Sequence, residues 1–304
     1  MNQFAHGSFE IFTPPASRRT EAITAVFGGS RQRAARSIER GGAAEDELLL
    51  AVEGPWGDIS QAALLTRTAG RTAMLYATSP RTALDGTCGS ALIQRAIAAA
   101  SRLDARIVQS LVEPEHNQAL SMFLRGGMRA IGTLSYLERP STTVGEGLVK
   151  VPHGVAIRPW MRQERALLEQ LLDETYIDSL DCPGLATMRP TAEILDGHLH
   201  TGIMHPDLWC ILEVDGKPCG VSLASEIPSA NCIELVYFGL APRARGRGLA
   251  GVLLDSACAS PRLHGNLSLA LACDERNHPA MRLYESRGFS MRVRRTALVA
   301  LAGT

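Results

Sequence analysis

The second half of the chain alternates apolar runs with amphipathic segments. Leucines recur at helical spacing over 162–176, and 191–199 reads as a second short helix. Apolar strands are predicted at 208–214 and 217–227, and the Asp215-Gly216 pair between them is a strong hairpin signal. The other predicted elements are a strand at 155–160, a loop at 181–190, a strand from Ile233 to Leu240, a helix at 249–259, a strand at 267–272, a helix after Asn277 and a final strand at 291–301. This order predicts an α/β domain.

The first 140 residues repeat this order in a weaker form. Helices are predicted at 31–40 and 89–103, and strands at 48–53, 62–68, 72–80 and 106–113. Between the halves, residues 139–154 concentrate Pro, Gly, Ser and Thr without apolar periodicity. The 304 residues are also enough for two domains of about 150 residues each. We therefore predict tandem domains over residues 1–140 and 155–304, joined by a linker over 141–154.

The junction IELVYFGLAPRARGRGLAG, from Ile233 to Gly251, turns an apolar strand into the start of a helix. Gly246 and Gly248 allow backbone amides to approach a ligand closely. The following helix adds its unpaired N-terminal amides and the positive end of its dipole. The guanidinium groups supplied by this junction suit phosphate oxygens, and they belong to Arg243, Arg245 and Arg247. The pattern predicts a diphosphate ligand.

The spacing of this junction narrows the choice of ligand. The order is R-x-x-G-x-G, from Arg243 to Gly248, which is neither the dinucleotide fingerprint G-x-G-x-x-G nor a P-loop. It resembles the acyl-CoA motif [QR]-x-x-G-x-[GA] of the GNAT superfamily of N-acyltransferases. Downstream, the segment from Asn277 to Phe289 is similar to that family's second motif, N-x-x-A-x-x-L-Y-x-x-x-G-F. Two motifs in the correct order are a much more specific signal than either alone.

The resemblance implies two tandem GNAT-like domains, each a mixed, mostly antiparallel sheet flanked by helices. It implies acetyl-CoA as the cosubstrate and a primary amine as the acceptor. It assigns Tyr284 as the acid that protonates the departing sulfur. Contacts to acetyl-CoA are expected from Leu240, Arg243, Arg245, Gly246, Arg247, Gly248, Leu249, Ala250 and Asn277.

The general base is predicted at Glu234, where some members of the family place a glutamate. Strict alternation puts Glu234, Val236 and Phe238 on one face of the strand, but a bulge is expected near Gly239. Glu234 is equally consistent with a solvated partner for arginine. The backbone amide of Leu240 is the one expected donor to the thioester carbonyl.

The acceptor site is the least defined part of the pattern. In the family the first two helices and their loop shape it, and here that loop brings Tyr176, Asp178, Asp181 and Cys182. The two aspartates can pair with a cationic amine, although polar caps and turn formers between helices are the more frequent role. The arginines of the final strand are weak evidence for an anionic acceptor. The histidines at 198, 200 and 205 lack supporting carboxylates, so we expect solvated loop residues and no metal.

The first repeat departs from the motifs at the positions that matter for the ligand. Where the phosphate-binding turn is expected it reads SPRTALDGTCGS, with Asp85 near the first glycine position and no arginine at Thr82 or Leu84. A carboxylate there repels a diphosphate. Phe123 stands where the tyrosine is expected, so no phenol is available. We expect a degenerate, structural domain.

The composition of the chain mainly excludes other classes of function and ligand. With 31 basic and 31 acidic residues the formal net charge is zero, so no global field favours nucleic acid or an anionic membrane. The N-terminal segment lacks a signal-peptide pattern, and we expect a cytoplasmic protein. The seven cysteines include no C-x-x-C pair and are expected to be buried, not bridged.

These observations predict an N-acetyltransferase that acetylates a small molecule or peptide amine in its C-terminal domain. A non-catalytic acyl-CoA-binding or scaffolding module is the alternative from another class. Because the sequence retains Tyr284, which a sensor does not need, the enzyme is favoured. The tandem arrangement also resembles the mycothiol synthase branch of the family, which leaves the amine of a thiol sugar as another possible acceptor.

Overall fold

The computed structural model describes residues 9–28, 46–141, 150–185, 187–259, 265 and 267–303. The chain forms two compact units, one comprising Met1–Ala130 with Thr296–Thr304 and the other Ile131–Arg295. The helix predicted at 31–40 and residues 142–149 of the predicted linker lie outside the described residues.

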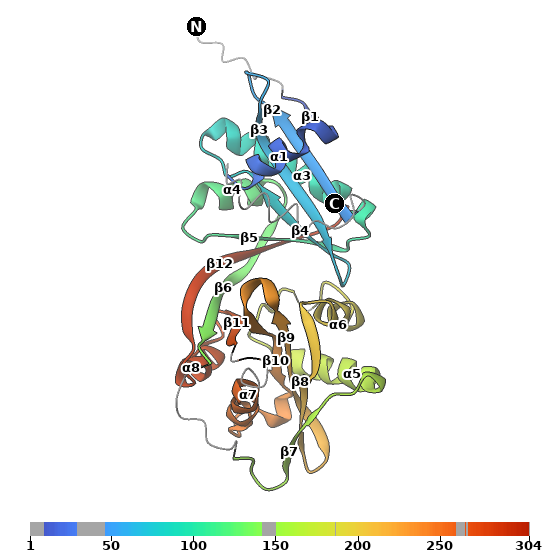
Figure 1. The fold of residues 1–304 in the computed structure, drawn as a ribbon, viewed down its shortest axis with the longest axis vertical. Helices are drawn as coiled ribbons and strands as arrows, with labels where there is room; N and C mark the ends of the chain where they lie inside the picture. The colour runs from blue at the N-terminus through green and yellow to red at the C-terminus, as the bar shows by residue number, and fades with distance from the viewer. Residues whose placement is uncertain are drawn as a thin grey trace. The chain divides into compact units, whose positions relative to one another are not determined.

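The first unit is a mixed sheet with helices on both faces (Figure 1). Its strands lie in the order β1-β2-β3-β4-β5-β12, in which β4 and β5 are parallel and the other adjacent strands pair antiparallel. Its elements are β1 (Ile11–Phe12), α1 (Arg19–Val26), β2 (Glu47–Glu53), β3 (Ile59–Thr68), β4 (Thr72–Ala77), α3 (Ala83–Ala99), β5 (Ile107–Val112), α4 (Asn117–Arg125) and the end of β12 (Ser290–Leu301). The sequence prediction missed α1.

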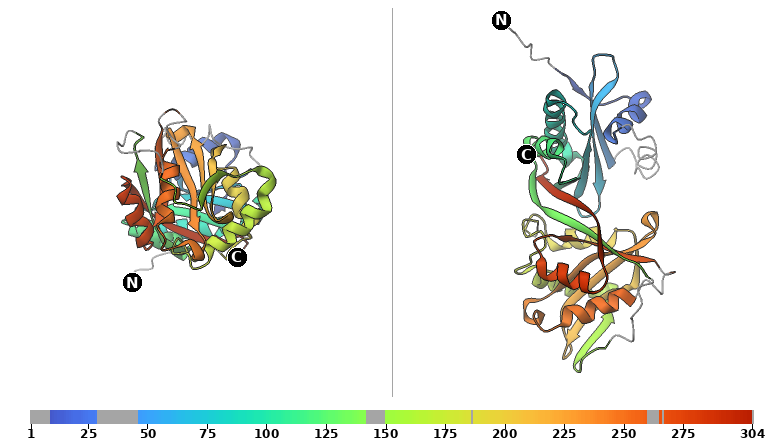
Figure 2. Two further views of the ribbon diagram at one scale, coloured as in Figure 1. Left: turned by 90° about the horizontal axis from the view of Figure 1, so that it is seen from below. Right: turned by 90° about the vertical axis from the view of Figure 1, so that its left-hand side faces the viewer.

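Alternation along β2 explains why helices cover both faces of this sheet. Leu49 and Ala51 pack with α1, whereas Leu50 and Val52 pack with α3 and α4. Successive strand residues point to opposite faces, so a continuous apolar run serves two cores. The edge-on view in Figure 2 shows α1 on one side of these strands and α3 and α4 on the other.

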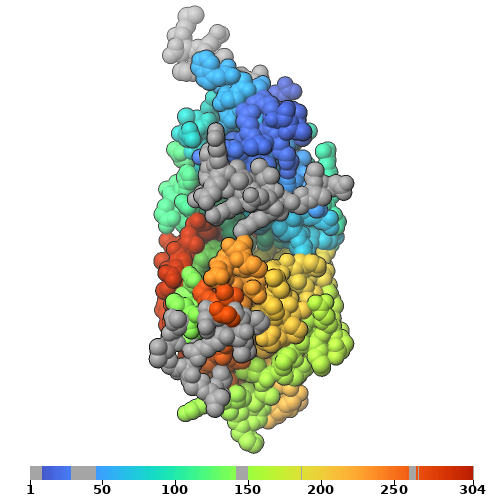
Figure 3. Space-filling view, viewed as in Figure 1, coloured from blue at the N-terminus to red at the C-terminus, as the bar shows by residue number. Residues whose placement is uncertain are grey.

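The second unit has the strand order β6-β11-β10-β9-β8-β7, with β10 and β11 parallel. Its helices α5 and α6 lie side by side at its surface (Figure 3). Its elements are β6 (Arg129–Arg139), β7 (Val155–Pro159), α5 (Arg165–Tyr176), α6 (Thr191–Leu199), β8 (Ile203–Val214), β9 (Lys217–Ile227), β10 (Cys232–Leu240), α7 (Leu249–Ala259), β11 (Ser268–Asp274), α8 (His278–Ser286) and the start of β12. The elements α6, β9 and α7 begin and end at the predicted residues.

The last strand of each repeat pairs within the other unit. β6 follows α4 along the chain, but Leu134–Arg139 pairs antiparallel with β11. The end of β12, Thr296–Leu301, pairs antiparallel with β5. The units therefore do not follow the predicted division at 141–154, because backbone ladder bonds and not chain order decide to which sheet a strand belongs.

The arginines of β12, which hinted at an anionic acceptor, have partners within the second unit. Arg292 pairs with Glu138 at 2.9 Å, and Arg294 pairs with Glu275. They consequently give no support to an anion site at this strand.

The strand that carries the predicted chemistry is irregular. β10 pairs with β11 only from Cys232 to Leu235, and its register with β9 shifts between Leu235 and Tyr237. The bulge thus lies at Val236, and the expectation of a bulge near Gly239 is wrong. Past the bulge, β10 has no ladder partner on its β11 side among the described strands, which opens space beside it.

Candidate active site

The turn before α7 has the geometry that its two glycines permit. Gly246 and Gly248 have φ of +72° and +77°, a region that L-residues rarely adopt. A Cβ built on either glycine meets no atom within 4 Å, so the space in front of the turn is open. The Gly251 amide donates to the Gly248 carbonyl at 3.1 Å, and the amides before it have no intrahelical acceptor. This helix end can therefore accept an anion.

The three arginines of this turn have different roles. Arg245 donates to the carbonyls of Leu240 and Thr175, both at 3.0 Å, so its side chain ties β10 to α5. Arg243 pairs with Glu174 and donates to the Pro218 carbonyl at 2.5 Å. Arg247 is exposed, and no described residue pairs with its guanidinium. The anion site thus rests on backbone amides, with Arg247 as the guanidinium that remains available.

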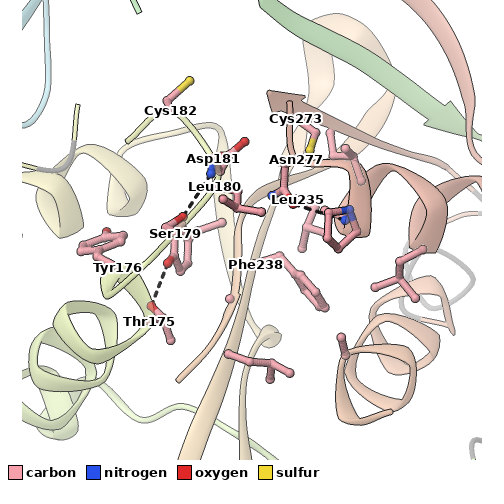
Figure 4. A pocket seen from close by; sticks show the side chains of 18 of the residues that line it. Thr175, Tyr176, Ser179, Leu180, Asp181, Cys182, Leu235, Phe238, Cys273 and Asn277 are labelled. Atoms are coloured by element: carbon pink, nitrogen blue, oxygen red, sulfur yellow. Dashed lines mark hydrogen bonds between the residues drawn. The ribbon is translucent and has the colours of Figure 1, made fainter. Parts of the chain in front are cut away.

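A cavity of about 600 Å³ extends from this turn along the open side of β10 (Figure 4). Of the predicted residues that contact acetyl-CoA, Arg243 and Arg247 are not part of its wall. The predicted residues that line it are Leu240, Arg245, Gly246, Gly248, Leu249, Ala250, Asn277 and Tyr284. The structure therefore brings the strand end, the helix end and both motif residues of α8 to one cavity.

The open edge of β10 presents a backbone donor. The Ala241 amide donates to the Cys219 carbonyl at 2.9 Å, so position 241 is hydrogen-bonded on the β9 side. Because amides alternate in direction along a strand, the Leu240 amide points away from β9. Its donation to a thioester carbonyl stays a prediction.

Asn277 and Tyr284 line the cavity from α8. The Asn277 side chain caps the helix by accepting from the Ala280 amide at 3.3 Å, which leaves its NH₂ group for other partners. Tyr284 is 6% exposed, and its ring contacts Phe238 with centroids 6.3 Å apart. Burial raises the pKa of Tyr284 well above its usual range, so its hydroxyl keeps its proton at neutral pH.

Two carboxyl groups compete for the role of base. Glu234 lies opposite Ser225 and Tyr237 opposite Leu223, so the bulge puts Glu234 and Tyr237 on one face. This corrects the expected grouping of Glu234 with Val236 and Phe238. Glu234 is half-buried, which raises its pKa, but it does not line the cavity.

Asp181 does line the cavity, together with Asp178. Its Oδ1 accepts from the Asp274 amide at 2.7 Å. Surrounding protein atoms desolvate the carboxyl group of Asp181 and so raise its pKa, even though the side chain is open to the cavity. Tyr284 lines the same cavity, and the charge of Asp181 adds to the increase in the pKa of Tyr284 that burial causes.

The acceptor side of the cavity contains residues that the sequence did not single out as binding groups. Arg189 and His198 join Tyr176 and Tyr237 in its wall. The Tyr237 ring contacts Tyr176 and His198, with centroids 5.4 and 5.8 Å apart. His198 belongs to this buried cluster and is not the solvated loop residue that was expected. No periodic signal marks these side chains as a group, because they come from a loop, two helices and strand β10.

In the first unit, the N-terminus of the corresponding helix is capped by side chains of the chain itself. Thr82 caps α3, and its Oγ1 accepts from the Asp85 amide at 3.2 Å. The Asp85 carboxylate accepts in return from the amides of Arg81 and Thr82, both at 3.0 Å. This capping box engages the Asp85 amide and puts a carboxylate at the helix N-terminus, and both features disfavour a bound anion. Phe123 is buried in the core of the first unit.

No group of three or more His, Cys, Asp or Glu side chains in the described ranges is arranged to hold a metal ion. All seven cysteines are free thiols. None of the described helices is both long and apolar enough to cross a membrane.

Comparisons with known proteins bear on the fold of the chain. Residues 165–289 match the acetyltransferase (GNAT) family model. A GCN5-related N-acetyltransferase from Sphaerobacter thermophilus is similar over 96% of this chain and 95% of that chain, with 18% identity and a TM-score of 0.63. A tandem GNAT protein from the clavulanic acid biosynthesis pathway is similar over 98% and 99%, with 16% identity and a TM-score of 0.53. No curated protein sequence matches the chain.

The chain has the fold of a tandem GNAT protein, and its residues 165–289 are the part that matches the GNAT family model. The general class of activity that this supports is acyl-CoA-dependent N-acetyl transfer.

Proposed function

We propose that the second unit transfers an acetyl group from acetyl-CoA to the primary amine of a small molecule. The observation that carries this proposal is the convergence of an open helix N-terminus, an open strand edge and Tyr284 on one cavity. The capped α3 of the first unit supports a structural role for that half.

The turn fits the diphosphate of acetyl-CoA, because the space in front of Gly246 and Gly248 is free. When bound, acetyl-CoA supplies an activated thioester. The Leu240 amide donates to a carbonyl placed at the strand edge, and Asn277 offers its NH₂ group to the arm of the ligand. Tyr284 holds a proton for a departing sulfur.

Asp181 is the better placed base, because it is open to the cavity and acts electrostatically on Tyr284. Glu234 stays the second candidate, since it shares a strand face with Tyr237. Either carboxylate would take the proton that the amine loses as the amide forms.

The test is Tyr284→Phe. A panel of small amines is first screened by release of the free thiol from acetyl-CoA. Phenylalanine keeps the ring packing but removes the proton donor, so kcat should fall by about 10²- to 10⁴-fold. Affinity for acetyl-CoA should change by less than about twofold. Acetyl-CoA binding without thiol release for any amine would instead favour the non-catalytic module.

A further inference from the structure

One part of the cavity wall carries polar groups that have no partner. The Tyr176 hydroxyl and the His198 Nε2 are buried and make no hydrogen bond with any described residue. A buried polar atom left unpaired costs about 1 to 3 kcal/mol. Unpaired buried polar atoms are rare in native proteins and need an explanation. Because these two atoms belong to residues that line a cavity, a bound ligand that hydrogen-bonds to them is such an explanation.

A cation stands beside these two atoms. Arg189 lines the same cavity, and its charge acts on the pKa of both Tyr176 and His198. Burial is the main influence on Arg189 and lowers its pKa, while Tyr176 and Glu193 raise it. A partly desolvated guanidinium binds an anion more strongly than one in water.

The net charge of these three side chains limits how much negative charge a bound anion can carry. Burial, with Arg189 nearby, lowers the pKa of His198 to about 4, so the imidazole is neutral at pH 7. Arg189 is then the one cation of the three. Asp178 and Asp181 line the same cavity and would repel a dianion. A carboxylate fits better than a phosphate, because it carries one charge and matches the planar guanidinium.

The group is held in place by aromatic packing. The Tyr237 hydroxyl and the Thr175 Oγ1 lie 2.7 Å apart, which fixes the ring that contacts both Tyr176 and His198. Figure 4 shows Tyr176 and Thr175 on the α5 side of the cavity and Asn277 on the other. An amine near Asp181 and a carboxylate at Tyr176 would belong to opposite ends of one small molecule.

We propose that the acceptor is a primary amine that carries a carboxylate, as an amino acid does. Its carboxylate binds Arg189, Tyr176 and His198, and its amine meets Asp181. This assignment rests on the proposed function, because it names the acceptor of that same site.

The experiment compares acceptors that differ in one charge. Kinetics are measured with α-amino acids, β-alanine and γ-aminobutyrate and with their carboxamides. Wild-type protein should prefer the best acid over its amide by about 10- to 100-fold in kcat/KM, as one charge-assisted contact predicts. In Arg189→Gln this ratio should fall toward one, because the acid loses much more kcat/KM than the amide does. Tyr176→Phe should reduce the ratio less.

The matched control is Arg162→Gln, an exposed arginine that does not line the cavity. It should keep the wild-type ratio. A wild-type preference for amides, or an equal loss for acid and amide in Arg189→Gln, would overturn the proposal. Faster turnover of O-phosphoethanolamine than of β-alanine would overturn the choice of a carboxylate.

A separate binding arm distinguishes this proposal from the proposed function. Calorimetry measures the binding of N-acetyl-amino acids and of their carboxamides to wild type and Arg189→Gln. Binding of the acids that Arg189→Gln loses supports the carboxylate site even if no amine is turned over. Equal binding of acids and amides, or no binding of either, contradicts it. The acetyltransferase proposal fails on a different result, namely no acetyl-CoA binding to the wild type.

Discussion

A pair of glycines with the same backbone conformation tests the anion site. Gly246 in the α7 turn and Gly216 in the β8–β9 hairpin both have φ of +72°, and a Cβ on either meets nothing within 4 Å. Placing an L-residue at this φ costs about 1 to 2 kcal/mol at each position. Gly246→Glu and Gly216→Glu should therefore lower stability by similar amounts.

Binding should separate the two variants. Glutamate at 246 fills the open space before α7 and adds a negative charge there. Each charge-assisted hydrogen bond contributes about 1.5 to 3 kcal/mol, so losing two weakens acetyl-CoA binding by about 10²- to 10⁴-fold. Gly216→Glu should bind as the wild type does, because Gly216 does not line the cavity.

The assay is calorimetric titration with acetyl-CoA, alongside urea unfolding of both variants. Wild-type protein should show one site per chain, since the Thr82–Asp85 capping box closes α3. Two comparable sites in the wild type, or unchanged stoichiometric binding in Gly246→Glu, would refute the reasoning.

Three further predictions follow from the site. Asp85→Ala removes the capping box, so it should cost about 0.5 to 2 kcal/mol of stability in urea unfolding. Acetyl-CoA affinity should stay the same, and a loss of affinity in this variant would contradict a purely structural role of the first unit. If Asp181 is the base, it must be ionised, so activity falls as pH drops through its pKa, which burial raises. Asp181→Asn should remove this acid limb of the kcat profile and Glu234→Gln should keep it; the reverse result would assign the base to the strand. His198 has a pKa of about 4 in the folded protein against 6.5 in the unfolded chain. The unfolded state therefore binds more protons between these values, and stability should fall by about 3 kcal/mol as pH drops from 7 to 4. His198→Gln should show a smaller loss over that range, and an unchanged loss would remove His198 as its cause.

The motifs were readable because their chemistry is local. Gly246 and Gly248 mark positive φ at the start of α7, and Asn277 marks the cap of α8. Helical spacing and the Asp215-Gly216 turn predicted α6, β9 and α7 with their observed bounds. Signals of this kind involve residues only a few positions apart, so a single sequence is enough to detect them.

Other parts of the site required the folded chain. The bulge at Val236 has no distinctive residue, yet it decides that Glu234 and Tyr237 share a face. The side chain of Arg245 bonds to carbonyls of α5 and β10, a role that spacing along the chain does not reveal. Arg189 and His198 come to share one cavity wall only when the chain folds.

The sequence by itself predicted the two repeats, the glycine turn before α7 and the place of Tyr284 on α8, because these depend on short-range backbone conformation. Tertiary structure alone decided the exchange of β6 and β12 and which side chains share the wall of the cavity. Backbone ladder bonds join any two strand edges that meet, whatever their side chains. Which edges meet is therefore settled by the packing of the whole chain.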